Sequence, residues 1–315
     1  MKVKRVIPIL AVTLLLLAGV GVLFLGGGPG EPESGKIKII ATIYPLSYYA
    51  EQIGGDRVEV TQLIPNNSEV HSWQPSISDI VAAEEADIIL SNGAGLDHWL
   101  EDDILPSIDM EGKTLVETTE GAELITLEGQ AIDDEHGHAV LDPHTWISPY
   151  MAQHQAGKVY EALAEYDSAN NEYYEERWTS FESELQRLDD QYMTEVAARS
   201  ARRNKIFTTH TAFGYLAHRY GFEQHGVVGV SADEQPSTAT ISRILDLMTE
   251  EEIYTIYVDP IYAEEYAQTL RSELEERTGE EVQILKLYFM LGPMDGLDYL
   301  EQMVANLENL KEGLQ

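Results

Sequence analysis

The sequence predicts an α/β protein in which one long, rigid helix joins two similar lobes of βα units with mostly parallel sheets. Three observations lead to this fold class. Short β-rich runs alternate with helical patterns over residues 36–117, and the same alternation returns over residues 205–314. Between the two series lies a long stretch with neither Gly nor Pro. Strands that alternate with helices are typical of βα units around a parallel sheet.

The first series predicts an N-terminal lobe at residues 36–165. Its elements are short and separated by turn residues; Gly54 and Gly55, for example, stop the first helix. We expect strands at 38–42, 58–64, 87–91 and 113–117, and helices at 46–53, 78–86 and 96–108.

The stretch without Gly or Pro predicts the linking helix, which we assign to residues 166–203. Large apolar residues recur there at helical spacing, which places them on one face of a helix from Asn171 to about Arg202. These residues are Tyr174, Trp178, Phe181, Leu185, Leu188 and Tyr192. A helix of about 30 residues is about 45 Å long, which suits a rigid strut between two lobes.

The second series predicts a C-terminal lobe at residues 204–315. We expect strands at 205–209, 222–230, 254–258 and 282–289, and helices at 212–220, 238–249, 262–278 and 297–314. Two α/β lobes joined by one strut leave a cleft between them, which is the usual place for a ligand.

The composition excludes several classes of function. The chain has 20 Lys plus Arg against 55 Asp plus Glu, for a net charge of -35, whereas a nucleic-acid partner requires a basic face. The 43% of hydrophobic residues and the 17 Tyr indicate a packed protein. The absence of Cys rules out disulfides, thiolate metal sites, thiol nucleophiles and a lipid attached through Cys.

Residues 1–35 resemble an export segment followed by a tether. Basic residues at positions 2, 4 and 5 precede an apolar run over residues 6–25, and a Gly/Pro/Glu-rich stretch follows. A run of this length can span a bilayer. It is longer than the usual core of a secretory signal and continues directly into glycines, which favours an uncleaved anchor over a cleaved signal. Positive charge before the run keeps that end in the cytoplasm, so the body faces outward.

Three histidines lie in comparable places. His71, His144 and His210 each stand just beyond a predicted strand or in a loop, and Pro and Trp residues near the first two would stiffen the loops and exclude water. Because strand ends of an α/β lobe point into the cleft, these side chains can converge as metal ligands. The alternative is that each imidazole is structural. Two more histidines, His136 and His138, lie in an acidic loop that could capture a divalent metal weakly.

Five segments resemble the solute-binding subunits of zinc and manganese ABC transporters, the ZnuA/TroA-like metal-binding family. They are ATIYP at 41–45, HSWQPSISDI at 71–80, ADIILSNGAGLD at 86–97, DPHTWISP at 142–149 and THTAFGYLAHRYG at 209–221. The resemblance covers nearly all of residues 38–314. It implies a long helix between two lobes, and it implies that His71, His144 and His210 bind the metal.

The chain departs from the family at the fourth ligand, which the family often supplies from a Leu-Asp-Pro-Leu segment in the last strand. Here residues 284–290 read ILKLYFM, with Tyr288 about where the Asp would stand and Asp295 displaced from it. A phenol is a poor ligand unless the metal lowers its pKa. The fourth position therefore goes to water, to Tyr288 or to a shifted carboxylate such as Asp295.

The resemblance implies extracytoplasmic capture of a divalent metal ion and its delivery to an ABC permease and its ATPase, with no reaction catalysed. Three imidazoles favour zinc, with manganese as the alternative, because the missing carboxylate is the hard ligand that manganese prefers. We expect a monomeric body. A cell-surface adhesin or metal buffer without a permease shares every motif. A zinc hydrolase is a further alternative, but the sequence lacks His-Glu-x-x-His or a comparable helical pair.

Overall fold

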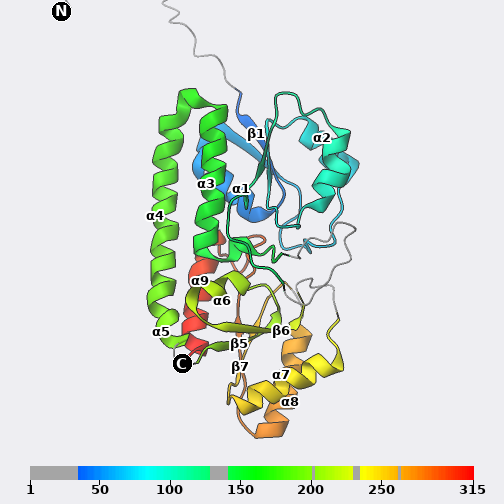
Figure 1. Ribbon diagram of the computed structural model, residues 1–315, viewed down its shortest axis with the longest axis vertical. Helices are drawn as coiled ribbons and strands as arrows, with labels where there is room; N and C mark the ends of the chain where they lie inside the picture. Colours follow the sequence, from blue (N-terminus) through cyan, green and yellow to red (C-terminus); the bar gives the residue numbers. More distant parts are fainter. Residues whose placement is uncertain (1–34, 128–140, 201–202, 230–234, 262–263) are drawn as a thin grey trace, which may run out of the picture. The chain divides into compact units, whose positions relative to one another are not determined.

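Two parallel sheets, one in each half of the chain, organise the described residues (Figure 1). The computed structural model describes residues 35–127, 141–200, 203–229, 235–261 and 264–315. Most of the predicted export segment, residues 1–34, lies outside these ranges. Among the described helices, none combines the length and apolar character needed to cross a membrane.

The first sheet has the strand order β2-β1-β3-β4, and every pair is parallel. Its strands are β1 (Ile37–Ala41), β2 (Val58–Gln62), β3 (Ile88–Ser91) and β4 (Thr114–Glu117). Ile39 in β1 lies opposite Val60 in β2 and Ile88 in β3. All four residues of β3 are buried, as expected of a strand that is covered on both faces.

The second sheet repeats this arrangement with the order β6-β5-β7-β8, again all parallel. Its strands are β5 (Lys205–His210), β6 (Glu223–Val228), β7 (Thr255–Val258) and β8 (Gln283–Lys286). Helices α7 (Thr238–Glu250) and α8 (Glu264–Thr278) pack their apolar residues against it. The predicted fold class, two similar lobes with parallel sheets, is confirmed.

The helices of the first lobe differ from the prediction in two places. Helices α1 (Tyr44–Gly54) and α2 (Ile77–Glu84) follow the expected pattern, but the helix expected at 96–108 is a π-helical turn (Leu100–Ile104) followed by a 3-10 turn (Leu105–Ser107). Pro106 stands in the 3-10 turn, where its missing N–H prevents a regular α-helical ladder.

Helix α3 (Pro149–Tyr166) has no counterpart among the predicted elements. It begins with Pro at its first position and buries residues on one face at helical spacing. Those residues include Met151, Ala152, Gln155, Ala156 and Val159. The helical spacing of apolar residues that indicates α3 was therefore present in the sequence.

Helix α4 (Asn171–Glu195) is the predicted long helix, and Figure 1 shows it side by side with α3. The predicted stripe is buried, apart from a partly buried Trp178. Helix α4 ends at Glu195, sooner than expected, and a short α5 (Ala197–Ser200) follows. Helix α4 contacts α1 in the first lobe and α6 (Gly214–Tyr220) in the second.

One buried carboxylate fixes α4 to α6. Asp189 in α4 is 3% exposed and accepts two hydrogen bonds from Arg219, at 3.0 and 2.6 Å. The hydroxyl of Tyr220 donates a third, at 2.8 Å. Because a buried charge is tolerated only when it is paired and hydrogen-bonded, this contact holds the helix in one position against the second lobe.

After β8 the chain returns to the first lobe. The Tyr299 hydroxyl, at the start of α9 (Tyr299–Gly313), lies 2.6 Å from the Tyr49 hydroxyl in α1 and also donates to the carbonyl of Trp146. The N–H of Asn67 donates to the carbonyl of Leu291 at 2.9 Å. Residues 287–291 thus belong to the same hydrophobic core as the first sheet, and residues 36–315 form one compact unit.

Candidate metal centre

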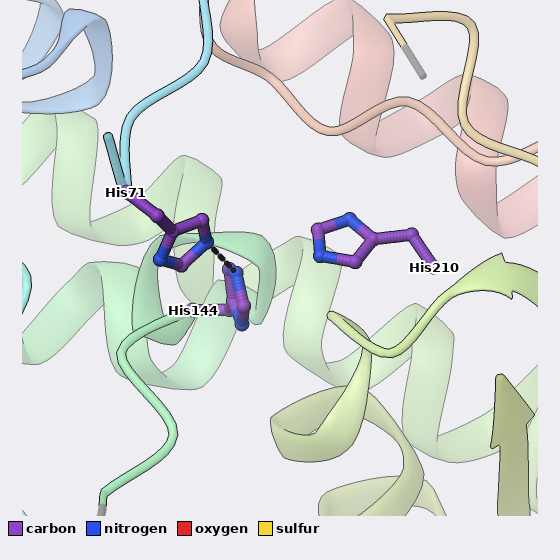
Figure 2. A group of neighbouring side chains, drawn as sticks. All are labelled: His71, His144 and His210. Carbon is purple, nitrogen blue, oxygen red and sulfur yellow. Dashed lines mark hydrogen bonds between the residues drawn. The ribbon is translucent and has the colours of Figure 1, made fainter. Parts of the chain in front are cut away.

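His71, His144 and His210 converge from three separate segments (Figure 2). His71 lies in the loop between β2 and α2, His144 precedes a 3-10 turn (Thr145–Ile147), and His210 is the last residue of β5. One nitrogen of each imidazole lies within 4.8 Å of the other two. Among the described residues, these three form the one such group of candidate ligands from His, Cys, Asp and Glu.

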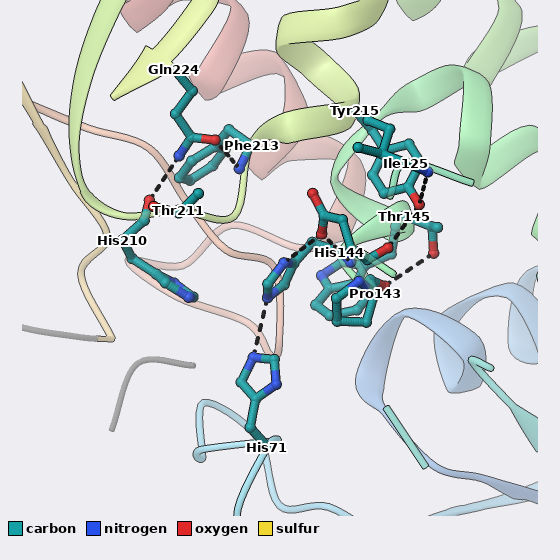
Figure 3. A network of polar contacts seen from close by, with 12 residues as sticks. His71, Ile125, Pro143, His144, Thr145, His210, Thr211, Phe213, Tyr215 and Gln224 are labelled. Atoms are coloured by element: carbon teal, nitrogen blue, oxygen red, sulfur yellow. Dashed lines mark hydrogen bonds and ion pairs between the residues drawn. The ribbon is translucent and has the colours of Figure 1, made fainter. Parts of the chain in front are cut away.

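A single carboxylate orients His144. Asp142 Oδ1 lies 2.8 Å from His144 Nδ1 and 3.0 Å from its backbone N, and all three groups are buried. The Tyr215 hydroxyl in α6 donates to the Asp142 carbonyl at 2.7 Å (Figure 3). With Nδ1 donating to the carboxylate, Nε2 of His144 carries a lone pair that points toward the other two imidazoles.

The turn that carries His144 is held by a buried polar network. The side-chain amide of Asn92, just after β3, donates to the Pro143 carbonyl at 2.9 Å. The Asn92 Oδ1 accepts from the Thr145 hydroxyl at 3.2 Å and from the Gln155 amide at 3.0 Å. Buried groups that are fully paired make a rigid support, so the first lobe presents His144 in one orientation.

His210 is positioned by the end of β5. Its carbonyl accepts from the Gln224 amide at 2.8 Å (Figure 3). The same carbonyl accepts from the Thr208 hydroxyl at 2.7 Å. Nδ1 of His210 lies 3.6 Å from the buried Asp259 Oδ2. A carboxylate therefore stands behind Nδ1 in two of the three imidazoles, an arrangement that raises the basicity of metal-binding histidines.

His71 is the one imidazole of the three that is not fully buried. Its Nε2 lies 3.2 Å from Nε2 of His144. Because the latter is an acceptor when Nδ1 donates to Asp142, the His71 Nε2 holds the proton between them in the metal-free protein. For a metal ion to bind both Nε2 lone pairs, this proton would move to Nδ1 of His71, which leaves the imidazole neutral.

Burial keeps the imidazoles of His71 and His144 neutral. It lowers the pKa of His71 to about 2, and the nearby His144 and His210 add to the effect. Burial also lowers the pKa of His144, although Asp142 opposes the shift. Imidazole binds metals in its neutral form, so the site is prepared for a cation without first losing protons.

Comparison with known proteins assigns a family. The model of the zinc-uptake complex component A periplasmic family matches residues 39–313. The chain belongs to this family. The high-affinity zinc uptake system protein ZnuA of Bacillus subtilis (strain 168) is 31% identical over 297 residues, which cover 91% of this chain and 90% of that protein.

Two further relatives agree with this assignment. The zinc-binding lipoprotein AdcA of Streptococcus pneumoniae serotype 4 is 28% identical over 309 residues, which cover 95% of this chain but 60% of AdcA. The crystal structure of the metal-dependent lipoprotein YcdH from Bacillus subtilis has 31% identity and a TM-score of 0.73, with 88% of this chain and 99% of that chain covered. As a member of the family, the chain is an extracytoplasmic metal-capturing subunit of an uptake system.

In this family member an aromatic wall closes one side of the imidazole cluster. The Phe289 ring lies 5.3 Å from the His144 ring and 5.2 Å from the His210 ring, measured between centroids. Trp146 lies 5.5 Å from both His144 and Phe289. Trp73, in contrast, packs on Trp99. Apolar rings around a cation site exclude water and strengthen electrostatic interactions inside it.

The structure directs the Tyr288 hydroxyl to a carboxylate outside the imidazole cluster. This hydroxyl donates to Asp295 Oδ2 at 2.8 Å, and Lys286 donates to the same oxygen at 2.6 Å. Burial, together with this contact with a carboxylate, raises the pKa of Tyr288 to about 12, which makes its phenolate harder to form. Asp295 is about half exposed and not part of the ligand cluster. His136 and His138 lie outside the described residues.

Two residues of the site were not assigned these roles by the sequence analysis. Asp142 stands within a quoted motif, two residues before His144, and this spacing was the available signal for its orienting role. Phe289 carried no comparable signal, because nothing in a run of apolar residues indicates which ring faces the histidines.

Proposed function

We propose that this protein captures Zn²⁺ with the imidazoles of His71, His144 and His210 and delivers it to an ABC permease and its ATPase. The observation that carries the proposal is the convergence of three imidazoles, two of them buried and the third partly buried, of which His144 is oriented by Asp142. Three imidazoles with one remaining position are a donor set that suits zinc. Manganese is the less favoured alternative, because it prefers oxygen ligands and the three ligands proposed here are nitrogens.

Water fills the fourth position of the proposed site. Tyr288 is a weak candidate because its hydroxyl already donates to Asp295. Asp295 would first have to leave Lys286, to which it is bound at 2.6 Å. We therefore retain the three histidines as the ligands from the protein, with Tyr288 and Asp295 as lesser alternatives to water.

We also propose roles for the segments of the chain that the comparisons leave open. Residues 1–35 anchor or export the protein, residues 36–165 and 204–315 form the two lobes, and residues 166–203 link them. The body is a monomer, and the acidic segment with His136 and His138 helps to capture metal without forming the main site. Deletion of residues 133–138 should leave one tightly bound ion in place and remove at most a weaker one, as counted by metal analysis.

The test uses the full chain, purified in detergent and freed of metal. Competition with a chromophoric zinc chelator should give one tight site, and His71→Ala, His144→Ala and His210→Ala should each weaken it by at least about tenfold. The control is His154→Ala, whose ring lies on α3 and contacts the Glu120 carbonyl. Parent-like affinity in all three site variants would place the metal elsewhere.

A second measurement separates transport from simple storage. The zinc-loaded protein should stimulate ATP hydrolysis by the proposed partner permease and ATPase, reconstituted in vesicles, and the metal-free protein should stimulate less. Tight zinc binding without any such stimulation would instead support a surface metal buffer or adhesin.

A further inference from the structure

Phe289 occupies a place beside the histidines that resembles that of a ligand but carries no donor atom. Its ring centroid is 5.3 Å from His144 and 5.2 Å from His210, and those two imidazoles are themselves 5.3 Å apart. The three rings therefore form a nearly equilateral triangle. Phe289 is 1% exposed, so no solvent separates it from the cluster.

Side chains from two other segments hold the backbone at Tyr288 and Phe289 in place. The Asn306 side chain, in α9, accepts from the Tyr288 N–H at 2.6 Å and donates to the Tyr288 carbonyl at 2.8 Å. Trp146 Nε1 donates to the Phe289 carbonyl at 2.9 Å. These three bonds fix the register of the segment, so it cannot slip by one residue and exchange Phe289 for Tyr288.

As a result, the side chains of Tyr288 and Phe289 lie in different surroundings. The Tyr288 hydroxyl meets Asp295 and Lys286 at a half-exposed surface, whereas the Phe289 ring meets two imidazoles in the core. Among the described residues, no carboxylate joins the three imidazoles within ligand distance. The segment that follows β8 thus contributes an apolar ring to the cluster and no oxygen.

We propose that Phe289 is a specificity-determining residue that keeps the coordination number low and so selects zinc against manganese. This inference rests on the proposed function of the histidine cluster. Zinc is stable with four ligands in a tetrahedral arrangement, whereas manganese prefers oxygen donors and more of them. A phenyl ring packed on two of the imidazoles supplies no donor and occupies volume that additional water molecules would need.

The test compares substitutions at two adjacent positions in the full-length protein. Phe289→Asp adds a carboxylate beside the imidazoles, and Phe289→Ala opens space for water. Phe289→Leu keeps an apolar side chain, and Tyr288→Asp adds the same carboxylate on the surface that faces Asp295. Each variant is titrated with Zn²⁺ and with Mn²⁺, and with Co²⁺ as a spectroscopic substitute for zinc.

Phe289→Asp and Phe289→Ala should each shift the ratio of manganese to zinc affinity toward manganese by at least about tenfold. The visible absorption of bound Co²⁺ should weaken at least about twofold in Phe289→Ala, because tetrahedral Co²⁺ absorbs more strongly than five- or six-coordinate Co²⁺. Phe289→Leu and Tyr288→Asp should stay within about threefold of the parent ratio.

The buried carboxylate of Phe289→Asp could prevent folding, so cooperative thermal melting is checked first and Phe289→Ala decides the question if the Asp variant does not melt cooperatively. A folded Phe289→Ala protein with the parent affinity ratio and the parent cobalt spectrum would overturn the proposal. If the parent itself binds no zinc, the proposed function fails, and this failure is visible before any Phe289 variant is measured.

Discussion

Asp142 Oδ1 lies 2.8 Å from the Nδ1 and 3.0 Å from the backbone N of His144, so one oxygen orients both the ring and the main chain of that histidine. Asp142→Asn keeps the shape and removes the negative charge that makes the imidazole a stronger donor. We expect zinc affinity to fall by about 10- to 100-fold. The measurement is competition with a zinc chelator on the metal-free full chain.

Asp259→Asn should have a smaller effect than Asp142→Asn, because Asp259 Oδ2 is 3.6 Å from His210 Nδ1. The matched control is Asp190→Asn, an exposed aspartate on α4 that should leave zinc affinity unchanged. Equal losses in all three variants would show that general charge, and not the contact with the imidazole, controls affinity.

Gly214 provides a steric test of the role of the Asp142 carboxylate. A Cβ at this position would lie 2.4 Å from Asp142 Oδ2, and the glycine has no positive φ that would strain another residue. Gly214→Ala should therefore displace Asp142 and weaken zinc binding by about tenfold, with the fold retained. Gly157→Ala in α3, whose added methyl would lie 3.6 Å from Trp178, is the control and should leave zinc affinity unchanged. Parent-like affinity in Gly214→Ala would contradict the orienting role of Asp142.

The stability of the metal-free protein should fall as the pH drops below about 6.5. The pKa of His71 is lowered from 6.5 to about 2, mainly by burial. Above pH 6.5 neither the folded nor the unfolded state binds a proton at this residue, but below it the unfolded state takes up a proton that the folded state cannot. Between about pH 7.5 and about pH 5, His71 should therefore remove about 2 kcal/mol from the free energy of unfolding.

Urea unfolding of the parent and of His71→Gln at both pH values isolates this contribution. The loss of stability on acidification should be about 2 kcal/mol smaller in the variant, and His98→Gln, at an exposed histidine, serves as the control. An identical loss in the parent and in His71→Gln would mean that His71 is protonated in the folded protein.

Asp189 should be important for stability, not for metal selectivity. Removing it in Asp189→Ala leaves the hydroxyl of buried Tyr220 and the partly exposed guanidinium of Arg219 without their partner. We expect the free energy of unfolding to decrease by about 2 kcal/mol. Asp190→Ala, next to it on the exposed face, should change it by less than about 0.5 kcal/mol in the same denaturation experiment. Equal effects at the two positions would exclude a special role for the Asp189 contact.

Much of the fold could be predicted because it depends on periodicity. The strands of both lobes and the apolar stripe of α4 repeat at the spacing of their elements, and the structure reproduces them. The interpretation of residues 96–108 as a helix was wrong because apolar spacing does not reveal how Pro106 interrupts the backbone ladder. Helix α3 was missed although its buried face has helical spacing.

The candidate site was only partly predictable, for a physical reason. His71, His144 and His210 stand at strand ends or in loops, and parallel strands bring such positions together. Which of Tyr288 and Phe289 faces the imidazoles depends on the register of a segment beyond the end of β8. Contacts with Asn306 and Trp146, far away in the sequence, set that register. Local pattern contains no information about such contacts.

The return of the chain end to the first lobe sets an order of events during folding. Tyr49 and Trp146 are synthesised long before Tyr299, which completes their hydrogen bonds, and the histidines all precede Phe289. The interior of the first lobe is therefore completed by a segment that follows both sheets in the sequence. A chain stopped before residue 287 lacks both the closing helix and one wall of the imidazole cluster, so the candidate metal centre is complete only after residues 287–313 have been made.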